Sequence, residues 1–418
     1  MSDPEKFLRI VQETTAQLGL NCFWVGGSLR DYFLKRESKD LDFAVRKHAR
    51  VIASKIAAQL DGAFFALKEE QSIYRVTLKD GYQLDFAKFK GPDISQDLAA
   101  RDFTINALAA ELSKDWPGPS EKMKVLDPHN GLADIRARQV RPVSPDIFTD
   151  DPLRMLRAYR ISAQLRFEIT QDTLDSIARH KKLIQSPASE RVREEIMLLL
   201  DCHDSAKHFR ALDQSGLISE IMPETDPNRA CALQYYPGKG VWGHSLDGLE
   251  RLEWIFENLE SEFGPDAGEI KTALDDRNCG ADGHPLSSIM KLAILFHDIG
   301  KAETAETIDG RMRFFEHEYV GAKMAAKMAR RLRFGADSEK SLRQLVQSHM
   351  RPGGLAHAPT ITDRAKLRFF RDLKELAVPM LIVSLADRYT YLTDDELGKG
   401  RDLHEKFVKE ILLWHYQK

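Results

Sequence analysis

The sequence predicts an α+β protein in which a small mixed sheet near the amino terminus is followed by helical domains. Before about residue 138, short strand-like apolar runs alternate with segments of helical spacing, and after it helical spacing prevails. A chain of 418 residues exceeds one ordinary core, so we expect several domains. The predicted divisions are a sheet-containing domain over 1–138, a helical segment over 139–222 and a helical domain over 223–418.

Four apolar runs bounded by turn residues predict the strands of the sheet. An uninterrupted helical pattern at 49–60 predicts a helix between the second and third runs. The Asp80-Gly81 pair supplies turn chemistry for a hairpin between the last two. The predicted strands cover residues 23–25, 41–45, 74–78 and 82–87.

The composition is typical of a soluble globular protein, with 43% hydrophobic and 30% charged residues. No stretch approaches the ~20 apolar residues of a membrane span, and the amino terminus carries no apolar leader. We therefore expect a cytoplasmic protein without a membrane partner. Four scattered cysteines argue against a disulfide framework or a thiolate zinc site: Cys22, Cys202, Cys231 and Cys279.

A glycine pair, Gly26-Gly27, follows the first strand and opens a helix with Ser28, Arg30 and Asp31. Glycines at such a turn let backbone N–H groups approach phosphates at the positive helix end. Taken alone, such a pair is more often a tight turn without any ligand. The motif therefore indicates a phosphate site only together with further residues.

Those further residues are the paired acids Asp40 and Asp42. Alternate strand residues point to one face, so the two carboxylates lie together. A cation between them offsets their repulsion, and Mg²⁺ with substrate phosphates is the natural candidate. Asp85 could join them from a neighbouring strand, or it could be a surface charge on an edge strand.

The run from Phe23 to Val45 resembles the Gly-Gly-Ser and Asp-x-Asp signature of nucleotidyltransferases related to polymerase β. It is most similar to the bacterial class (class II) of tRNA nucleotidyltransferases and poly(A) polymerases. Further motifs follow in order. Residues 101–107, which include Arg101, Asp102 and Asn106, resemble the motif that contacts the sugar and phosphates of the incoming nucleotide. Residues 127–131 resemble the connector between head and neck, and 189–193 resemble a helical support of the neck.

A fourth motif, Asp150-Asp151-Pro152-Leu153-Arg154, resembles the family's base-selecting element. Asp151 and Arg154, three residues apart, are expected on one helix face, where they can pair with a base edge. In the family this element reads ATP and CTP and excludes GTP and UTP. Arg157 is assigned to the same nucleotide-binding set.

The resemblance implies a polymerase β-like nucleotidyltransferase head with a small mixed sheet over 1–138. An all-α neck over 139–222 and an α-helical HD domain over 223–418 would follow. The implied partners are tRNA, CTP and ATP, and the implied cofactor of the head is Mg²⁺ held by Asp40, Asp42 and Asp85. Arg30, Arg101 and Arg154 would supply fixed positive charge to the nucleotide.

Only 15 residues separate Asp85 from Arg101. Many complete CCA-adding relatives carry a longer flexible segment there, which assists the switch from C to A addition. The short segment resembles enzymes that add only CC. Alternatively, another local loop performs the switch, and the sequence leaves both interpretations open.

The carboxy-terminal part carries His297-Asp298 at the end of an apolar helix, with His244 upstream and Asp387 downstream. This order resembles HD-domain phosphohydrolases. Imidazoles and carboxylates suit a transition metal such as Mn²⁺, Fe²⁺, Ni²⁺ or Zn²⁺. Two histidines between these ligands, His317 and His349, could contact a phosphate or a second ion, or they could lie on the surface or cap helices. Lys301 could bind a phosphate or cap a helix.

In tRNA nucleotidyltransferases an HD tail implies 2′,3′-cyclic phosphodiesterase or phosphatase activity on RNA ends. Three alternatives remain beside CCA or CC addition to tRNA. They are a poly(A) polymerase, an HD phosphohydrolase whose head only binds, and a non-catalytic RNA-binding scaffold. Intact acidic and basic motif residues argue against the last two.

The formal charge of −3 gives no electrostatic reason to expect an RNA partner. The segment 322–351 differs, because it carries eight basic residues against Asp337 and Glu339. It is either a solvated helix face or a track for RNA phosphates. The residues assigned to RNA binding are Lys327, Arg330, Arg331 and Arg333.

Overall fold

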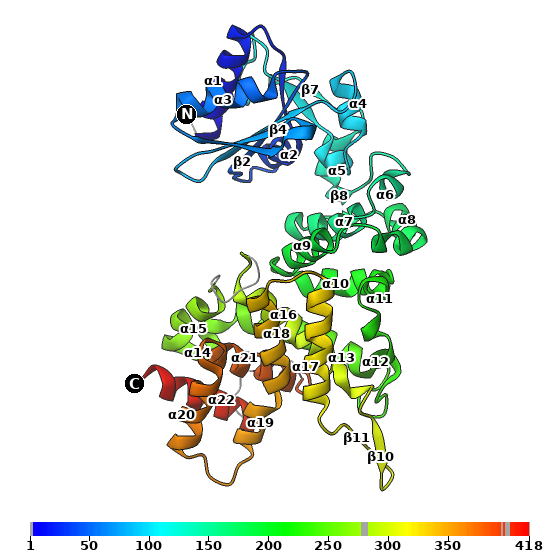
Figure 1. Ribbon diagram of the computed structural model, residues 1–418, viewed down its shortest axis with the longest axis vertical. Coiled ribbons are helices and arrows are strands. Elements are labelled where there is room, and N and C mark those ends of the chain that lie inside the picture. Colours follow the sequence, from blue (N-terminus) through cyan, green and yellow to red (C-terminus); the bar gives the residue numbers. More distant parts are fainter. Residues whose placement is uncertain (1–2, 277–282, 394–395, 398–401, 418) are drawn as a thin grey trace. The chain divides into compact units, whose positions relative to one another are not determined.

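The computed structural model describes residues 3–276, 283–393, 396–397 and 402–417 (Figure 1). The chain forms two compact units. The head unit comprises Met1–Arg154 and Leu165–Arg179, and the helical unit comprises Met155–Gln164 and His180–Lys418. The predicted neck, 139–222, is thus divided between the units, and the predicted domain boundaries stay predictions.

The head unit contains a seven-stranded sheet with strand order β3-β4-β5-β2-β1-β6-β7. Strand β2 pairs with β5 in parallel, and the other neighbouring strands of this sheet pair antiparallel, so the sheet is mixed as expected. The strands are β1 (Cys22–Val25), β2 (Asp40–Val45), β3 (Ala63–Lys68), β4 (Ile73–Thr77), β5 (Gln83–Lys88), β6 (Ala109–Glu111) and β7 (Val125–Leu126).

The four predicted strands correspond to β1, β2, β4 and β5, and the expected hairpin joins β4 to β5. Gly81 in its turn has φ +88°, a conformation that favours glycine. No strand was predicted at the position of β3. This edge strand is largely exposed, so it lacks the alternation that a buried face imposes.

Helices cover the sheet of the head unit. The predicted helix is α3 (Ala49–Leu60), which packs against β4 and β5, and α1 (Asp3–Gln17) packs against α3. Buried Phe43 and Phe86 stack at 4.9 Å between ring centroids on the two parallel strands. The other helices are α2 (Gly26–Phe33), α4 (Ile94–Ala99), α5 (Gly131–Ala137) and α6 (Ile147–Asp150).

Two helices belong partly to each unit: α7 (Arg154–Leu165) and α8 (Gln171–His180). The short strands β8 (Gln139–Val140) and β9 (Glu168–Ile169) pair in parallel within the head unit. Helices dominate after residue 138, as expected, with β8–β9 and one hairpin, β10 (Glu306–Ile308) and β11 (Arg311–Arg313), as departures.

The helical unit is built around α16 (Leu286–Phe296), whose residues are almost all buried. It packs against α13 (Gly240–Glu257), α18 (Ala336–Ser348) and α21 (Ala377–Tyr389). The end of α16 therefore lies in the core of the unit. The remaining helices are α9 (Ser189–Leu200), α10 (Ser205–Gln214), α11 (Leu217–Ile221), α12 (Pro227–Ala230), α14 (Leu259–Phe263), α15 (Ala267–Leu274), α17 (His317–Arg331), α19 (Met350–Ala356), α20 (Asp363–Leu373) and α22 (Leu403–Tyr416).

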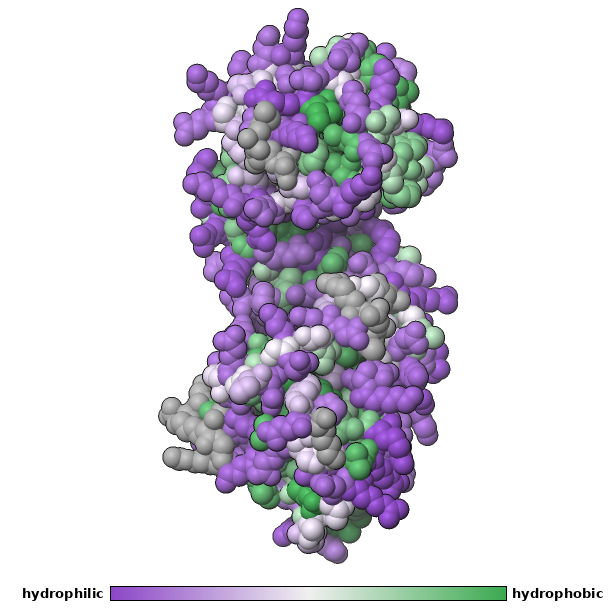
Figure 2. Space-filling model, turned by 90° about the vertical axis from the view of Figure 1, so that its left-hand side faces the viewer, coloured by the Kyte–Doolittle hydropathy of each residue, from purple (hydrophilic) through white to green (hydrophobic). Residues whose placement is uncertain are grey.

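Hydrophilic side chains cover most of the face seen in Figure 2, with apolar patches scattered among them. Within the described residues, no helix combines the length and apolarity needed to cross a bilayer. Cys22, Cys202 and Cys231 are free thiols, whereas Cys279 lies outside the described residues.

Candidate active site and metal centre

The three predicted acids of the head lie on adjacent parallel strands. Asp40 and Asp42 belong to β2, and Asp85 stands opposite Asp42 in the register of β5. Because β5 lies between β4 and β2, the interpretation of Asp85 as an edge-strand charge is wrong. Register thus brings together the carboxylates that the sequence predicted.

The electrostatics of this group favour a bound cation. Burial raises the pKa of Asp42 to about 6, although the positive charge of Arg101 opposes the shift. Negative charges on Asp85 and Asp40 raise the pKa further. Carboxylate oxygens are the ligands that Mg²⁺ prefers, and a divalent cation would favour the ionised state of all three acids.

Arg75 is a partner of this site that sequence reasoning missed. It stands opposite Asp85 on β4 and donates two hydrogen bonds to that carboxylate, at 2.8 and 2.7 Å. A hydrogen bond to Asp85 raises the pKa of the Arg75 guanidinium. The signal was available only through strand pairing, because the two residues are ten apart in sequence.

The glycine turn lies directly against the acids. Gly26 has φ +74°, and a Cβ there would lie 2.9 Å from Arg101 Nη1 and 3.1 Å from Asp42 Oδ2. The buried Ser28 hydroxyl accepts hydrogen bonds from Trp24 Nε1 at 2.8 Å and from the Asp42 backbone N–H at 3.2 Å. The absence of a side chain at Gly26 therefore lets Arg101 and Asp42 lie close to the turn, and the Ser28 hydroxyl links the turn to β2 by a hydrogen bond.

Asn106 links the arginines beside this turn. It accepts a hydrogen bond from Arg30 Nη1 on its side-chain oxygen at 2.6 Å and one from Arg101 Nη1 on its backbone carbonyl at 3.3 Å. Its amide donates to Asp102 at 3.1 Å, and Asp31 pairs with Arg30 at 2.8 Å. These contacts orient two guanidinium groups near the acids.

The base-selecting motif differs from the sequence expectation in one respect. Asp150 ends α6, and Asp151 lies in the turn before α7 with extended backbone, φ −146°. Its carboxylate accepts a hydrogen bond from the Leu153 N–H at 3.2 Å. The prediction that Asp151 and Arg154 share one helix face is therefore wrong, because an extended residue interrupts the helix.

Arg154, the first residue of α7, donates to the carbonyl of Ala100, the residue directly before Arg101, at 2.7 Å. Arg157 belongs to the helical unit, where its Nη1 lies 3.8 Å from Glu195 Oε1 on α9. Gly26, Gly27 and the other assigned nucleotide contacts stay predictions.

A second cluster of titratable side chains lies in the core of the helical unit. It comprises two groups, in each of which the ligand atoms lie within 4.8 Å of one another. All but one of its members are buried, and they come from α13, the end of α16, the start of α17, the end of α18 and α21. The groups are His244, His297 and Asp387, and Asp298, His317 and His349.

Backbone carbonyls set the orientation of three of the four imidazoles, and the Thr390 hydroxyl lies 3.2 Å from Nδ1 of the fourth, His244. The Nδ1 atoms of His297, His317 and His349 each lie 2.7–2.8 Å from the carbonyl oxygen three residues earlier. A donating Nδ1–H leaves the Nε2 lone pair facing the cluster. In each case the end of a helix or turn supplies the carbonyl that fixes the tautomer.

The cluster fits a metal ion. His244 Nε2, His297 Nε2 and Asp387 Oδ1 are buried without a hydrogen-bond partner among the described residues. Burial acts to lower the pKa of His297, but Asp298 and Asp387 outweigh it and raise that pKa to about 10. This excess of negative charge favours a cation, and mixed imidazole and carboxylate ligands suit a transition metal.

Asp298 connects the two groups. Its Oδ2 lies 3.2 Å from His297 Nε2, and its Oδ1 lies 3.3 Å from His317 Nε2 and 3.6 Å from His349 Nε2. Both of the latter histidines are buried, so the interpretation of them as surface residues is wrong. A carboxylate with one oxygen toward each group can bridge two ions.

Lys301 reaches the same carboxylate. Its Nζ lies 2.5 Å from Asp298 Oδ2 and donates to Tyr236 Oη at 2.9 Å, and Tyr236 Oη lies 3.1 Å from Tyr391 Oη. Burial acts against the charge of Asp298, but His297 and Lys301 hold its pKa well below the ordinary value. Sequence reasoning missed both tyrosines, which no motif contained.

The four residues assigned to RNA binding have different surroundings. Arg331 donates to the Ile221 carbonyl and to both carboxylate oxygens of Glu224. Arg330 Nη1 lies 3.1 Å from Glu339, and Arg333 Nε lies 3.9 Å from Glu190. Lys327 is exposed on α17. The positive charge of Arg331 is therefore neutralised by the ion pair with Glu224.

Three known families match successive parts of the chain. The "Poly A polymerase head domain" matches residues 22–141, and the "HD domain" matches residues 241–392. Between them, the "Probable RNA and SrmB- binding site of polymerase A" matches residues 166–228. Their order follows the order of the two sites along the chain.

The A-adding tRNA nucleotidyltransferase of Deinococcus radiodurans is 30% identical over 93% of this chain and 81% of the relative. The chain belongs to the tRNA nucleotidyltransferase family. The CC-adding tRNA nucleotidyltransferase of Thermus thermophilus is also 30% identical, over 94% of this chain and 82% of the relative. The Thermotoga maritima CCA-adding enzyme complexed with tRNA shares the fold, with TM-score 0.65 and 19% identity over 98% of this chain and 81% of that one.

Membership of the tRNA nucleotidyltransferase family confirms the resemblance inferred from the motifs and the predicted α+β fold. The protein is a nucleotidyltransferase, as are its relatives. The two relatives named above add different nucleotides at equal identity, so overall similarity does not decide the product.

Proposed function

We propose that the protein adds nucleotides to the 3′ end of tRNA, using CTP and ATP as donors. The observation that carries the proposal is the group of Asp40, Asp42 and Asp85 beside the Gly26 turn and Arg101. Paired carboxylates next to a glycine turn and a fixed guanidinium suit transfer of a nucleotidyl group.

In the proposed reaction, the 3′-oxygen of the RNA forms a bond to the α-phosphorus of the nucleotide. The bond from that phosphorus to the bridging oxygen breaks, and pyrophosphate leaves. Asp40 and Asp42 would hold Mg²⁺, with Asp85 beside them. The bound ion would lower the pKa of the attacking hydroxyl and offset charge on the leaving group.

The protein's own groups would orient the nucleotide. Arg30 and Arg101, held by Asn106, would lie beside the triphosphate, and the turn at Gly26 would let backbone N–H groups approach it. Asp151 accepts and Arg154 donates hydrogen bonds, a combination that can pair with the edge of cytosine or adenine.

Within this function we infer that CC is the main product. The segment between Asp85 and Arg101 is short and ordered. It contains α4, and the Asp93 carboxylate caps this helix by accepting a hydrogen bond from the Gln96 N–H at 3.0 Å. Asp97 accepts hydrogen bonds from Arg101 at 3.0 Å and from the Lys90 N–H at 2.9 Å. A segment held in this way offers little freedom to reshape the site for adenine.

The test is incubation of the protein with tRNA lacking its 3′ end, Mg²⁺ and labelled CTP or ATP. We expect products that end in CC and little addition of A. A CCA product would contradict the inference about the segment alone. An A tail on RNA without C addition would point to poly(A) polymerase activity, and no incorporation would contradict the proposed function.

For the helical unit we propose metal-dependent hydrolysis of phosphate esters at RNA ends, including 2′,3′-cyclic phosphates. The supporting observation is the set of buried, unpartnered Nε2 and carboxylate atoms, which would hold Mn²⁺, Fe²⁺, Ni²⁺ or Zn²⁺. Such an ion would supply a hydroxide near neutral pH. Purified protein should bind Mn²⁺ or Ni²⁺ and hydrolyse a 2′,3′-cyclic nucleotide, and His297→Ala should lose both; hydrolysis that persists in this variant would contradict the proposal.

A further inference from the structure

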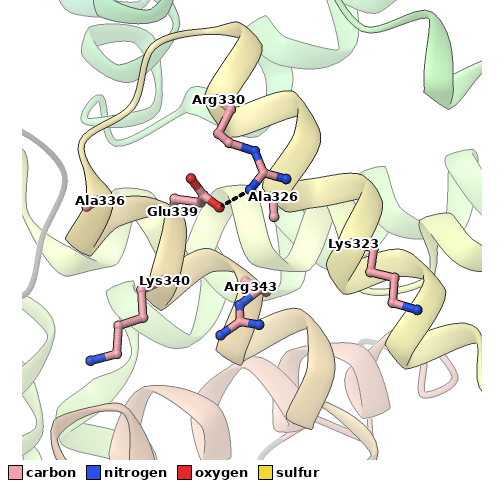
Figure 3. A pocket seen from close by; sticks show the side chains of 7 residues that line it. All are labelled: Lys323, Ala326, Arg330, Ala336, Glu339, Lys340 and Arg343. Carbon is pink, nitrogen blue, oxygen red and sulfur yellow. Dashed lines mark ion pairs between the residues drawn. The ribbon is translucent and has the colours of Figure 1, made fainter.

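A groove lies between α17 and α18, which pack along each other. Figure 3 shows cationic side chains from both helices around it. One part has a volume of about 360 Å³ and is lined by Lys323, Arg330, Lys340 and Arg343, with small Ala326 and Ala336 between them. A second hollow of about 440 Å³ shares Lys323 and Arg343 with the first and so adjoins it. We call them together the α17–α18 groove.

The cations of the groove differ in how far the protein neutralises them. Arg330 pairs with Glu339 across the groove, as the dashed line in Figure 3 marks. Lys323, Lys340 and Arg343 are exposed and form no ion pair within the part of the chain that the structure describes. Arg331, by contrast, is engaged by Glu224. The available positive charge therefore lies at residues other than those the sequence assigned.

The surroundings make this concentration of charge notable. Residues 211–418 hold 28 basic and 33 acidic side chains, a net charge of −5. The groove lining carries four cations, Lys323, Arg330, Lys340 and Arg343, against two acids, Glu339 and Glu316, so its net charge is positive within a segment of opposite sign. Grooves of one charge sign raise the local concentration of ligands of the other sign.

We propose that the α17–α18 groove binds the sugar-phosphate backbone of RNA through Lys323, Lys340 and Arg343. Lys323 and Arg330 are separated by two helical turns, about 10 Å along α17, so the groove suits successive phosphates better than one mononucleotide. The alanines between the cations let a backbone approach closely. The proposal rests on the proposed function in tRNA processing, and it deepens that function by naming an RNA site in the helical unit.

The position of the groove relates it to the metal cluster. The same two helices carry His317 at the start of α17 and His349 directly after α18. Lys323 follows His317 by six residues and Arg343 precedes His349 by six, about 9 Å along each helix. RNA bound in the groove therefore lies within two helical turns of the metal ligands.

The experiment compares two triple variants of the full chain. Lys323→Gln/Lys340→Gln/Arg343→Gln removes the groove cations, and Lys271→Gln/Lys374→Gln/Lys406→Gln removes three exposed cations elsewhere in the helical unit. Dissociation constants for tRNA lacking its 3′ end are measured at several salt concentrations. Steady-state addition of C gives the KM for tRNA and for CTP in the same proteins.

The groove variant should bind tRNA at least about 10-fold more weakly at low salt. The slope of log affinity against log salt should fall by about 2, since each lost phosphate contact removes roughly 0.7–0.9 from it. The KM for tRNA should rise while the KM for CTP stays unchanged, and the control variant should match the wild type.

Unchanged tRNA affinity in the groove variant would overturn the inference, as would equal weakening of both variants. A different result would separate the two proposals: the wild type binds tRNA but transfers no nucleotide, and the groove variant binds tRNA more weakly. In that case the groove inference stands and the proposed function fails. Circular dichroism and the unfolding midpoint check that both variants fold; exposed Lys→Gln changes should leave them unaltered.

Discussion

The head carboxylates and the HD cluster gather charged residues in opposite ways. In the head, strand register places Asp42 beside Asp85, only partly covered by the protein, and Arg75 pairs with Asp85. In the helical unit, helix ends direct buried imidazoles at Asp298, and backbone carbonyls orient the rings of His297, His317 and His349. An open oxygen-only site suits an ion that arrives with a nucleotide, whereas a buried imidazole site suits a resident ion.

The largest expected effect separates the two sites. Asp42→Asn should lower nucleotidyl transfer at least about 1,000-fold, because several kcal/mol of metal-dependent stabilisation is lost. Metal bound by the helical unit should not change. Single-turnover incorporation of labelled CTP and the metal content of the purified protein are the measurements, with Asp80→Asn, an exposed acid in the β4–β5 turn, as control. Substantial transfer by Asp42→Asn would refute the assignment.

The converse substitution should affect only the helical unit. His297→Ala removes a buried ligand atom, so the affinity for Mn²⁺ or Ni²⁺ should fall more than about 100-fold, beyond the usual loss from outer-shell changes. Calorimetric titration of metal-stripped protein measures this loss. C addition by the head should stay within a factor of two of the wild type; a parallel loss of both would mean that the sites are not independent.

A smaller effect is expected at the glycine turn. Gly26→Ala introduces a Cβ 2.9 Å from Arg101 Nη1 and 3.1 Å from Asp42 Oδ2, at a positive φ. We expect roughly a 10-fold or greater loss of kcat/KM for CTP, since displaced charges no longer meet the nucleotide.

Gly19→Ala is the matched control for this turn. Gly19 also has a positive φ, +65°, but nothing lies within 4 Å of a Cβ there. Both variants should lose about 1–2 kcal/mol of stability to backbone strain. Equal activity of the two would show that strain alone, and not the crowding of Arg101 and Asp42, governs the turn.

The smallest effect concerns the neighbours of the metal cluster. Tyr236→Phe removes the hydroxyl that accepts a hydrogen bond from Lys301, and a single bond of this kind contributes about 1 kcal/mol. The unfolding midpoint of the helical unit should fall by about 2–4 °C in a thermal scan of metal-free protein. A fall of more than about 10 °C would indicate that Tyr236 holds the cluster together.

Comparison of the sites also shows what the sequence could predict. Alternation and paired acids predicted β2, β5 and the carboxylate group, because both depend on the two-residue period of a strand. The exposed edge strand β3 carries no such period and was missed. Asp151 was misplaced because one extended residue ends α6, a local turn that motif spacing does not encode.

In the helical unit, the order of His244, His297, Asp298 and Asp387 was sufficient to predict that these side chains come together. The position of Asp298 between the two groups and its contacts with His317 and His349 could not be predicted, because they depend on helix ends that are far apart in the sequence and close in the fold. The basic segment shows the same limit. Composition located its charge, but only tertiary pairing with Glu224 distinguishes the engaged Arg331 from Lys323 and Arg343.

The central claim is that the head alone performs nucleotidyl transfer and that the helical unit holds a separate metal centre. The most direct measurement is side-by-side incorporation of labelled CTP into tRNA lacking its 3′ end by the wild type, Asp42→Asn and His297→Ala. We predict CC products from the wild type and His297→Ala and none from Asp42→Asn. Incorporation by Asp42→Asn, or its loss in a folded His297→Ala protein, would contradict the claim.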